Sequence, residues 1–445
     1  MCRKCKEGRG NRSLIVGLLV SLIVGMTGTV HGQYIRSCGM ASPLSSHAIA
    51  AGPAPGAGEW EVVPSLCVSE RYDSNVFYAA PQPGLTRNDF VTNVSPNLLV
   101  SHNGEYVSGS LNAGGFYEAY VNNSGINFFG TNDNLSLNLD NSIKRLFPNA
   151  SLQITDVVRY APLPPGFSQV AAGTSPGAPV NSQNVYAQGF LTTRTNNVTN
   201  TATVSTSYAT TASTSLNASY SYAILRWGSS PLPSTSQTGL FNSTIQTGTV
   251  GGQARLSGLD TLNVRFSHMQ SEFTPTSDST SSSFFKTDTA TLGWSRILTP
   301  NLVAEVGGGG IVINPGLTTY AVNAAVVMKF QTNSATISYS RAAFPSLGTA
   351  AQPIVANVFS LAAVQKLAQQ WQIAETANYA HGSGSGAGGL TYDTYFATVD
   401  IYYWVTPIWS TALSYDYMNY NTESGATTTA WSRQAITFSI RATWD

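Results

Sequence analysis

The sequence predicts an all-β protein, a transmembrane antiparallel β-barrel of about 18 strands, with roughly 16 to 18 as the range. From about residue 59 onward, segments of about ten residues alternate apolar with polar side chains and are separated by turn sequences. The last segment shows this best: one face carries Gln434, Ile436, Phe438, Ile440, Ala442 and Trp444, and the other carries Ala435, Thr437, Ser439, Arg441 and Thr443. One face therefore suits lipid and the other suits water.

The first 58 residues precede this pattern. Residues 1–32 have the form of a secretory signal peptide, with a basic start, an apolar run over 14–26 and small residues before Gln33. An uncleaved N-terminal anchor is the alternative. Residues 33–58 are rich in Ala, Pro, Gly and Ser and predict a flexible periplasmic lead-in. The expected division is thus signal peptide, lead-in and a barrel over 59–445.

Composition supports a membrane protein without a spanning helix. Only 10% of the residues are charged, against roughly 25% in soluble domains. Without its signal peptide the chain has 17 basic and 21 acidic residues, a net charge of about −4. Such a charge balance lacks the basic excess of nucleic-acid-binding proteins. After residue 33 no segment approaches the roughly 20 apolar residues of a spanning helix, so strands must cross the membrane.

The connections form two alternating sets. Short turns, such as Thr299–Asn301 and Thr332–Ser334, predict a periplasmic end, and longer connections predict an external end. An even number of strands leaves both termini periplasmic, and a barrel of this size has room for an aqueous lumen. The longer connections are expected at about 74–88, 122–131, 161–195, 228–240, 274–284, 345–353, 382–390 and 421–430.

Aromatic residues are expected to form a girdle at each interface. Those beside the short turns are Phe147, Trp294, Phe330, Trp371, Trp404, Trp409 and Trp444. Those beside the longer connections are Tyr72, Phe90, Tyr160, Trp227, Phe241, Phe273, Phe344 and Trp431. The aromatic core of a soluble β-solenoid or sandwich is the alternative interpretation.

The alternation also predicts which charges line the lumen. The candidates are Glu61, Arg71, Asp140, Arg159, Arg255, Arg265, Glu305, Lys329, Asp400, Arg433 and Arg441. Opposed charges on a pore wall can create a transverse field that selects small solutes, although solvated wall residues paired with neighbours are the alternative. Arg255 and Arg265 are the best pair for an anion-attracting patch. The excess of basic residues predicts a mild preference for anions.

No catalytic, cofactor or metal motif is present, so we expect a protein that is not an enzyme and needs no cofactor. His268 is the single candidate for wall catalysis, and an interfacial histidine is the alternative. Cys38 and Cys67 could form a disulfide in an oxidising compartment. The connection 161–195 is the longest, and it predicts a constriction loop, an external binding loop or a disordered external loop.

The first hairpin resembles a known family. Residues 70–77, Glu-Arg-Tyr-Asp-Ser-Asn-Val-Phe, are followed by Asp89–Thr92 and Val94–Pro96, and together they resemble the opening of β-barrel porin family 2. That family contains bacterial outer-membrane barrels, some of them linked with exopolysaccharide production. The resemblance implies location and architecture for about 59–445. It implies neither a substrate nor catalytic residues.

These observations predict an outer-membrane channel that allows passive diffusion of small polar solutes through a weakly charged lumen. The alternative is an accessory outer-membrane component of exopolysaccharide secretion, or a surface interaction protein. The expected partners are outer-membrane lipid, small polar solutes or polysaccharide, and the barrel-assembly machinery during insertion. The sequence gives no indication of the oligomeric state.

Overall fold

The computed structural model describes residues 58–81, 84–163, 166–167, 188–189, 195–228, 241–275, 282–314, 316–345, 353–384, 390–424 and 427–444. The expected signal peptide and almost all of the lead-in lie outside these residues, so both stay predictions. No helix in the described part of the chain is long and apolar enough to cross a membrane.

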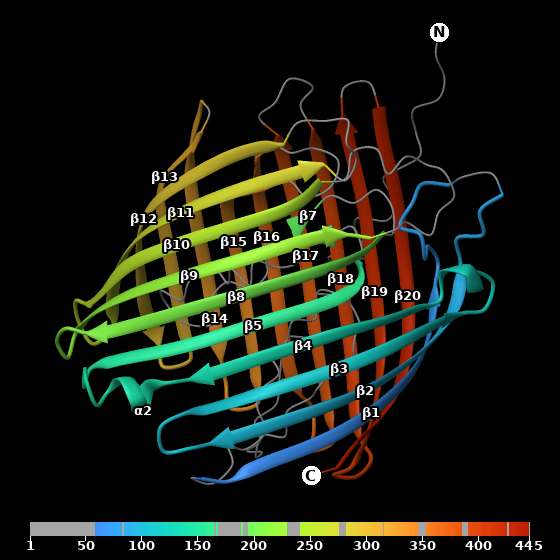
Figure 1. Cartoon of the computed structure of the whole chain (residues 1–445), viewed down its shortest axis with the longest axis horizontal. Helices are drawn as coiled ribbons and strands as arrows, with labels where there is room; N and C mark the ends of the chain where they lie inside the picture. The colour runs from blue at the N-terminus through green and yellow to red at the C-terminus, as the bar shows by residue number, and fades with distance from the viewer. Residues whose placement is uncertain are drawn as a thin grey trace.

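The described chain forms one closed antiparallel barrel of 18 strands (Figure 1). Each strand pairs with the next strand of the barrel in chain order, and the last pairs with the first, which closes the sheet. The strands are β1 (Trp60–Asp73), β2 (Asp89–Asn103), β3 (Ser108–Tyr120), β4 (Phe128–Asn138), β5 (Ala150–Leu163), β8 (Thr195–Ala209), β9 (Thr214–Trp227), β10 (Phe241–Arg255), β11 (Asp260–Pro275), β12 (Ser283–Thr299), β13 (Leu302–Asn314), β14 (Leu317–Lys329), β15 (Asn333–Pro345), β16 (Pro353–Lys366), β17 (Trp371–Gly384), β18 (Thr391–Trp404), β19 (Trp409–Ser424) and β20 (Thr427–Thr443). The predicted fold class and strand number are confirmed.

Short elements lie in some connections. The β3–β4 connection holds a 3₁₀ turn, η1 (Ser124–Ile126), and the β4–β5 connection holds a one-turn helix, α2 (Asp140–Ile143). The connection between β5 and β8 contributes a two-stranded sheet of β6 (Gly166–Phe167) and β7 (Gln188–Gly189). Apart from the β4–β5 connection, the turns at one end of the barrel are short, and β1 begins and β20 ends there, as expected for the periplasmic end.

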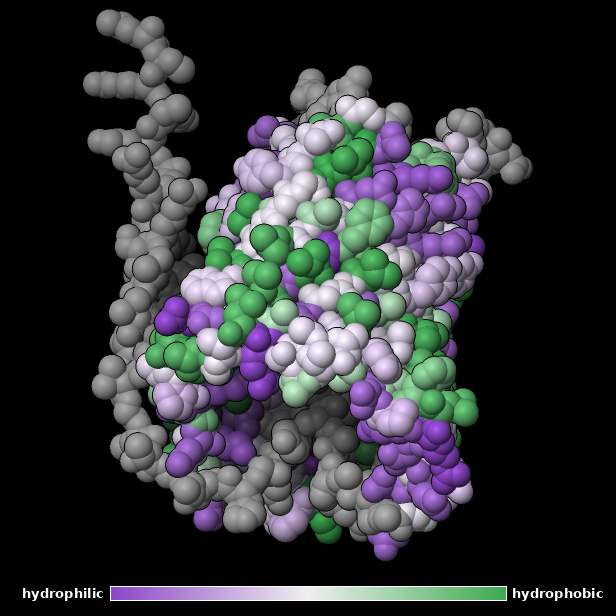
Figure 2. Space-filling model, turned by 90° about the vertical axis from the view of Figure 1, so that its left-hand side faces the viewer, coloured by the Kyte–Doolittle hydropathy of each residue, from purple (hydrophilic) through white to green (hydrophobic). Residues whose placement is uncertain are grey.

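Side chains alternate between the two faces of the wall. On β20, Ile436 is 51% exposed and Phe438 49% exposed, whereas Thr437 and Arg441 are buried. The exposed row is apolar because it faces lipid, and the buried row is polar because it faces the lumen. Figure 2 shows apolar side chains gathered on part of one outer face, bordered by hydrophilic ones. The register predicted for the last segment is confirmed.

The predicted outer girdle is partly wrong. Phe273, Phe344 and Trp431 are buried in clusters of the lumen-facing row, and Trp227 and Phe241 pack against one of these clusters. Position beside an outer loop sets the height of a side chain, but the alternation sets the face on which it lies. The exposed aromatic residues at the external side of the barrel include Tyr72, Phe90, Tyr160, Tyr222, Phe284, Phe359 and Tyr395.

Candidate functional site

The predicted wall residues lie on the row of each strand that faces the lumen. Arg159 is on β5, Arg255 on β10, Arg265 on β11, Glu305 on β13, Lys329 on β14, Asp400 on β18, and Arg433 and Arg441 on β20. They do not form one cluster. Arg159 and Arg433 lie in the external half, while Arg255 and Lys329 end their strands at the periplasmic end.

Two of the expected arrangements differ from the structure. Arg265 lies opposite Gly251, four residues from Arg255, so about 13 Å of wall separates the two arginines, and they do not form a single patch. Asp140 is not a wall residue, because it begins α2 in the β4–β5 connection. Its Oδ1 there accepts a hydrogen bond from the backbone N–H of Leu152 at 2.8 Å.

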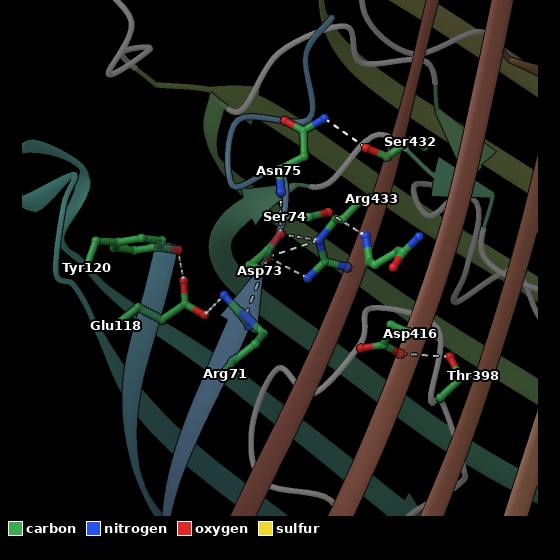
Figure 3. Close-up of polar contacts among 11 residues, drawn as sticks. Arg71, Asp73, Ser74, Asn75, Glu118, Tyr120, Thr398, Asp416, Ser432 and Arg433 are labelled. Carbon is green, nitrogen blue, oxygen red and sulfur yellow. Dashed lines mark hydrogen bonds and ion pairs between the residues drawn. The ribbon is translucent and has the colours of Figure 1, made fainter. Parts of the chain in front are cut away.

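Buried ion pairs join the first and last strands at the external end of the lumen (Figure 3). Arg433 donates from Nε to Asp73 Oδ1 at 3.0 Å and from Nη2 to Asp73 Oδ2 at 2.7 Å. Arg71 on β1 donates from Nη2 to Glu118 Oε1 on β3 at 3.1 Å, and the Tyr120 hydroxyl donates to the other oxygen of Glu118. We call these five residues the rim network. They form a continuous polar contact across β20, β1 and β3.

The connection after β1 folds onto this network. The side-chain amide of Asn75 donates to the carbonyl of Ser432 on β20 at 3.2 Å and to that of Ala79 at 3.0 Å. Its backbone N–H donates to Asp73 Oδ1 at 3.0 Å. Asn75 is fully buried, so these bonds hold the connection against β20 (Figure 3).

Aromatic contacts hold the same connection. The ring centroid of Tyr78 lies 6.0 Å from that of Trp431, and the guanidinium of Arg433 lies 5.3 Å from the Tyr78 ring. Tyr78 adopts a backbone φ of +53°, which non-glycine residues rarely adopt. Residues 74–79 thus form a segment, here called the latch, that is fixed against the lumen wall.

Sequence reasoning missed four acidic residues of the wall, one of them Asp89, which begins β2 opposite Asp73. Asp73, Glu118 and Asp416 are all buried on the lumen-facing row, and Asp416 Oδ1 accepts a hydrogen bond from the Thr398 hydroxyl at 2.8 Å. The alternation contained the signal, because Asp73 has the same parity as Arg71, and Glu118 the same as Asn112. These carboxylates offset much of the predicted basic excess.

Two residues of opposite charge lie on opposite walls of the periplasmic half. Arg265 lies five residues from the periplasmic end of β11, and Asp400 lies four residues from that end of β18. These strands are seven positions apart in the ring of 18, almost diametrically opposed. The arrangement suits a transverse field across the lumen.

Asparagine amides extend along the wall where glycines face them. Asn263 lies opposite Gly293, and Asn323 lies opposite Gly307. A Cβ at either glycine would stand 2.5 Å from the facing Oδ1, so glycine leaves room for the amide in its present orientation. These pairs add neutral hydrogen-bonding groups to the wall without adding bulk toward the axis.

The β5–β8 connection reaches the far wall. β7 pairs with β6 and lies against β15. Six strands separate β8 from β15 in one direction around the ring, and nine separate β5 from β15 in the other. β7 thus lies near a strand remote from both β5 and β8. The rest of the connection lies outside the described residues, so the roles expected for 161–195 stay predictions.

Other sequence candidates lie elsewhere. His268 is on the exterior row of β11, where Nδ1 lies 2.7 Å from Asp288 Oδ1, so it does not face the lumen. Cys67 is disulfide-bonded, but Cys38 lies outside the described residues, so their pairing stays a prediction. In the described part of the chain, no group of three or more His, Cys, Asp or Glu side chains could hold a metal ion.

No family model and no curated protein matches this sequence. Among solved structures, the outer membrane protein OpdK of Pseudomonas aeruginosa aligns over 86% of this chain and 99% of its own, at 9% identity and a TM-score of 0.44. The siderophore receptor PirA of the same organism aligns over 86% and 80%, at 9% identity and a TM-score of 0.41. A loop-deletion mutant of OmpT, an outer membrane protein of Vibrio cholerae, aligns over 87% and 100%, at 12% identity and a TM-score of 0.39.

The closed sheet and its apolar exterior define the class of protein. A closed antiparallel barrel with an even number of strands, lipid-facing apolar rows and a polar interior is the architecture of outer-membrane barrels. This protein is an integral β-barrel of the bacterial outer membrane.

Proposed function

We propose that this protein is a channel through which small polar solutes diffuse passively, narrowed by the connection between β5 and β8. The observation that carries the proposal is the position of β7 against β15, on the far side of the lumen from the strands that the connection joins. A barrel of 18 strands is wide enough for an aqueous lumen, and a loop that crosses it sets the size limit.

The chemistry of the wall supports small polar solutes. Its lumen-facing rows carry many hydroxyl and amide groups, and the fixed charges of Arg265 and Asp400 stand on opposed walls. Neutral hydrogen-bonding groups replace part of a solute's hydration without holding it, which favours passage. A transverse field orients dipolar solutes and disfavours apolar ones.

Planar-bilayer conductance tests this proposal. Deletion of residues 168–187, with β6 and β7 kept, should raise the single-channel conductance by about two-fold or more, because conductance follows the narrowest section. Deletion of 230–239 in the β9–β10 connection is the matched control and should leave the conductance almost unchanged. A wild-type barrel without conductance would contradict the proposal and favour the secretion-accessory alternative.

We also propose that the chain is a member of β-barrel porin family 2. The support comes from the structural roles of the resembling residues. Asp73 and Asn75 belong to the rim network and the latch. Asp89 accepts hydrogen bonds from the backbone N–H groups of Asn122 and Asn123 at 2.9 Å each, which ties the β3–β4 connection to β2. The resembling hairpin thus encodes one closely packed external rim.

A further inference from the structure

The exterior of the barrel is not apolar all the way round. On β4, β5 and β8 the outward rows include Asp133, Asp156 and Asn200, whose parity matches that of the exposed Tyr160 and Val198. Asn200 donates from Nδ2 to Asp156 Oδ1 at 2.6 Å. Asp133 lies diagonally from Asp156 across the β4–β5 pair, at about 7–8 Å.

Apolar residues neighbour these carboxylates along the outward rows, on both sides of Asp156 and on one side of Asp133. Ile154 and Val158 precede and follow Asp156 on the outward row of β5, and Leu135 follows Asp133 on that of β4. Asp156 is at the middle of its strand, seven residues from Leu163. A carboxylate in this position would face hydrocarbon in an isolated barrel, which is unfavourable.

The same exterior face carries a second polar edge on β10, β11 and β12. Its outward residues include Gln246, His268, Gln270, Lys286 and Asp288. Gln270 lies opposite Gln246 on one side and Lys286 on the other, and His268 lies opposite Asp288, with which it makes a contact. The Tyr220 hydroxyl donates a hydrogen bond to Gln246. β9 lies between the two edges and presents Tyr220 and Tyr222 outward. Figure 1 shows β4 to β12 as one broad side of the barrel.

We propose that this face, from β4 to β12, is the interface of a homodimer whose two-fold axis runs along the membrane normal at β9. Such an axis brings β8 of one copy toward β10 of the other and β5 toward β11, whereas β4 and β12, three strands from the axis, lie at the margins of the face. Because both copies stand the same way up in the membrane, residues at equal depth meet.

The depths of the two edges match. Asp156 and His268 each lie seven residues from the external end of their strands, so the axis brings a carboxylate to an imidazole. Asn200 and Gln246 each lie five residues from that end, so amide meets amide.

A second copy fits this face better than lipid does. Asp156 accepts a hydrogen bond from Asn200 and Asp133 one from the backbone N–H of Gly114. Acyl chains offer no counter-charge to either carboxylate, whereas a second copy presents His268 toward Asp156. The strands nearest the axis, β5 to β11, span about 19 Å in width, and an apolar band is about 25 Å tall. The resulting area of about 480 Å² per copy lies at the low end of interface sizes.

Cross-linking through a single cysteine tests the axis. A residue near a two-fold axis lies beside the same residue of the second copy. Tyr222→Cys in native membranes should therefore give a covalent dimer with a short bis-maleimide. Tyr395→Cys on β18 is the matched control, because it is equally exposed on the exterior at similar depth but lies outside the face. Equal dimer yield at both positions, no dimer at Tyr222→Cys, or capture of a different protein there would each overturn the proposal.

Charge reversal tests the contacts. Asp156→Lys should convert the dimer to a monomer in native mass spectrometry from lipid nanodiscs, whereas Glu375→Lys, an exterior carboxylate on β17, should leave the dimer intact. Heat-modifiable migration on gels shows whether each variant has a folded barrel. A wild-type monomer, or a folded Asp156→Lys variant that stays dimeric, would contradict the proposal.

Discussion

At the external rim, the pair of Asp73 and Arg433 joins residues that are 360 positions apart in the chain. Both side chains are almost completely buried, so removal of one partner leaves a charge in a poorly solvated site. We expect Arg433→Met to lower the free energy of unfolding by about 3–5 kcal/mol. The measurement is the urea midpoint of the purified barrel in detergent, followed by tryptophan fluorescence.

Substitution of both partners shows how much of the lost stability comes from the unpaired buried charge and how much from loss of the ion pair. The double variant Asp73→Leu with Arg433→Met removes both charges and should recover much of the lost stability. Arg255→Met is the matched control, because Arg255 is exposed at the periplasmic end of β10 and should change the midpoint little. A midpoint for Arg433→Met equal to that of Arg255→Met would show that the pair contributes nothing.

Neighbouring residues of one strand test which face meets lipid. Ile337 on β15 is 51% exposed on the exterior row, and Ser338 is on the lumen-facing row. Ile337→Arg should cost up to about 2–4 kcal/mol, depending on its depth, whereas Ser338→Arg should be tolerated. Equal losses in a denaturant titration of both variants would mean that the assignment of faces is wrong.

The sequence allowed the face of single residues to be predicted within strands, and it failed where a strand meets a loop. Arg433 and Arg441 were placed correctly because unbroken alternation surrounds them. Asp73 was overlooked because the following Ser74-Asn75 has the composition of a turn, and Asp140 was misplaced because a short helix interrupts the pattern. Contacts such as Asp73–Arg433 depend on closure of the sheet, which no local pattern encodes.

At the scale of elements, the latch gives a prediction about mobility. Ala79 is 2% exposed, and the carbonyl of Ala79 accepts a hydrogen bond from the Asn75 side chain. A cysteine at Ala79 should therefore react slowly with a water-soluble thiol reagent, and much faster when Asn75→Ala is added. The rate is measured by mass spectrometry of the intact protein.

Thr86→Cys is the control for the latch, because Thr86 is exposed in the same connection. It should react quickly with and without Asn75→Ala. An Ala79→Cys rate that Asn75→Ala does not change would show that the side chain of Asn75 does not fix the latch.

Elements were predicted well because their signal is periodic. The alternation located the strands, and the two classes of connection gave the correct strand parity. The aromatic girdle was less predictable, because an aromatic side chain near a loop can point either toward lipid or into the lumen. Phe273 stacks on Phe285 inside the barrel at a centroid distance of 5.6 Å, and such a partner on the next strand is visible only once the register is known.

For the whole molecule, the distribution of charge predicts the ion selectivity. The basic excess predicted from sequence is reduced by Asp73, Glu118 and Asp416, so we expect at most a slight preference for anions. Arg255→Glu with Arg265→Glu should shift the reversal potential toward cations, and the shift should shrink as salt shortens the Debye length below about 8 Å. Reversal potentials in a salt gradient measure this.

Arg226→Glu is the control for selectivity, because Arg226 lies on the exterior row of β9. It should leave the reversal potential unchanged. An equal shift for Arg226→Glu and for the double variant would mean that distant surface charge, not the lumen wall, determines selectivity.

Closure of the sheet by β1 and β20 has a consequence for biogenesis. The first strand to be translocated must remain an open edge, with unpaired backbone groups, until the last strand arrives. Loop-closure entropy makes such a long-range pairing slow, and an exposed edge meanwhile invites association with other chains. We therefore expect the unfolded chain to be prone to association for longer than the chain of a barrel of eight strands. Arg433 on the last strand meets Asp73 when β20 and β1 are in the native register, so we expect their ion pair to favour that register.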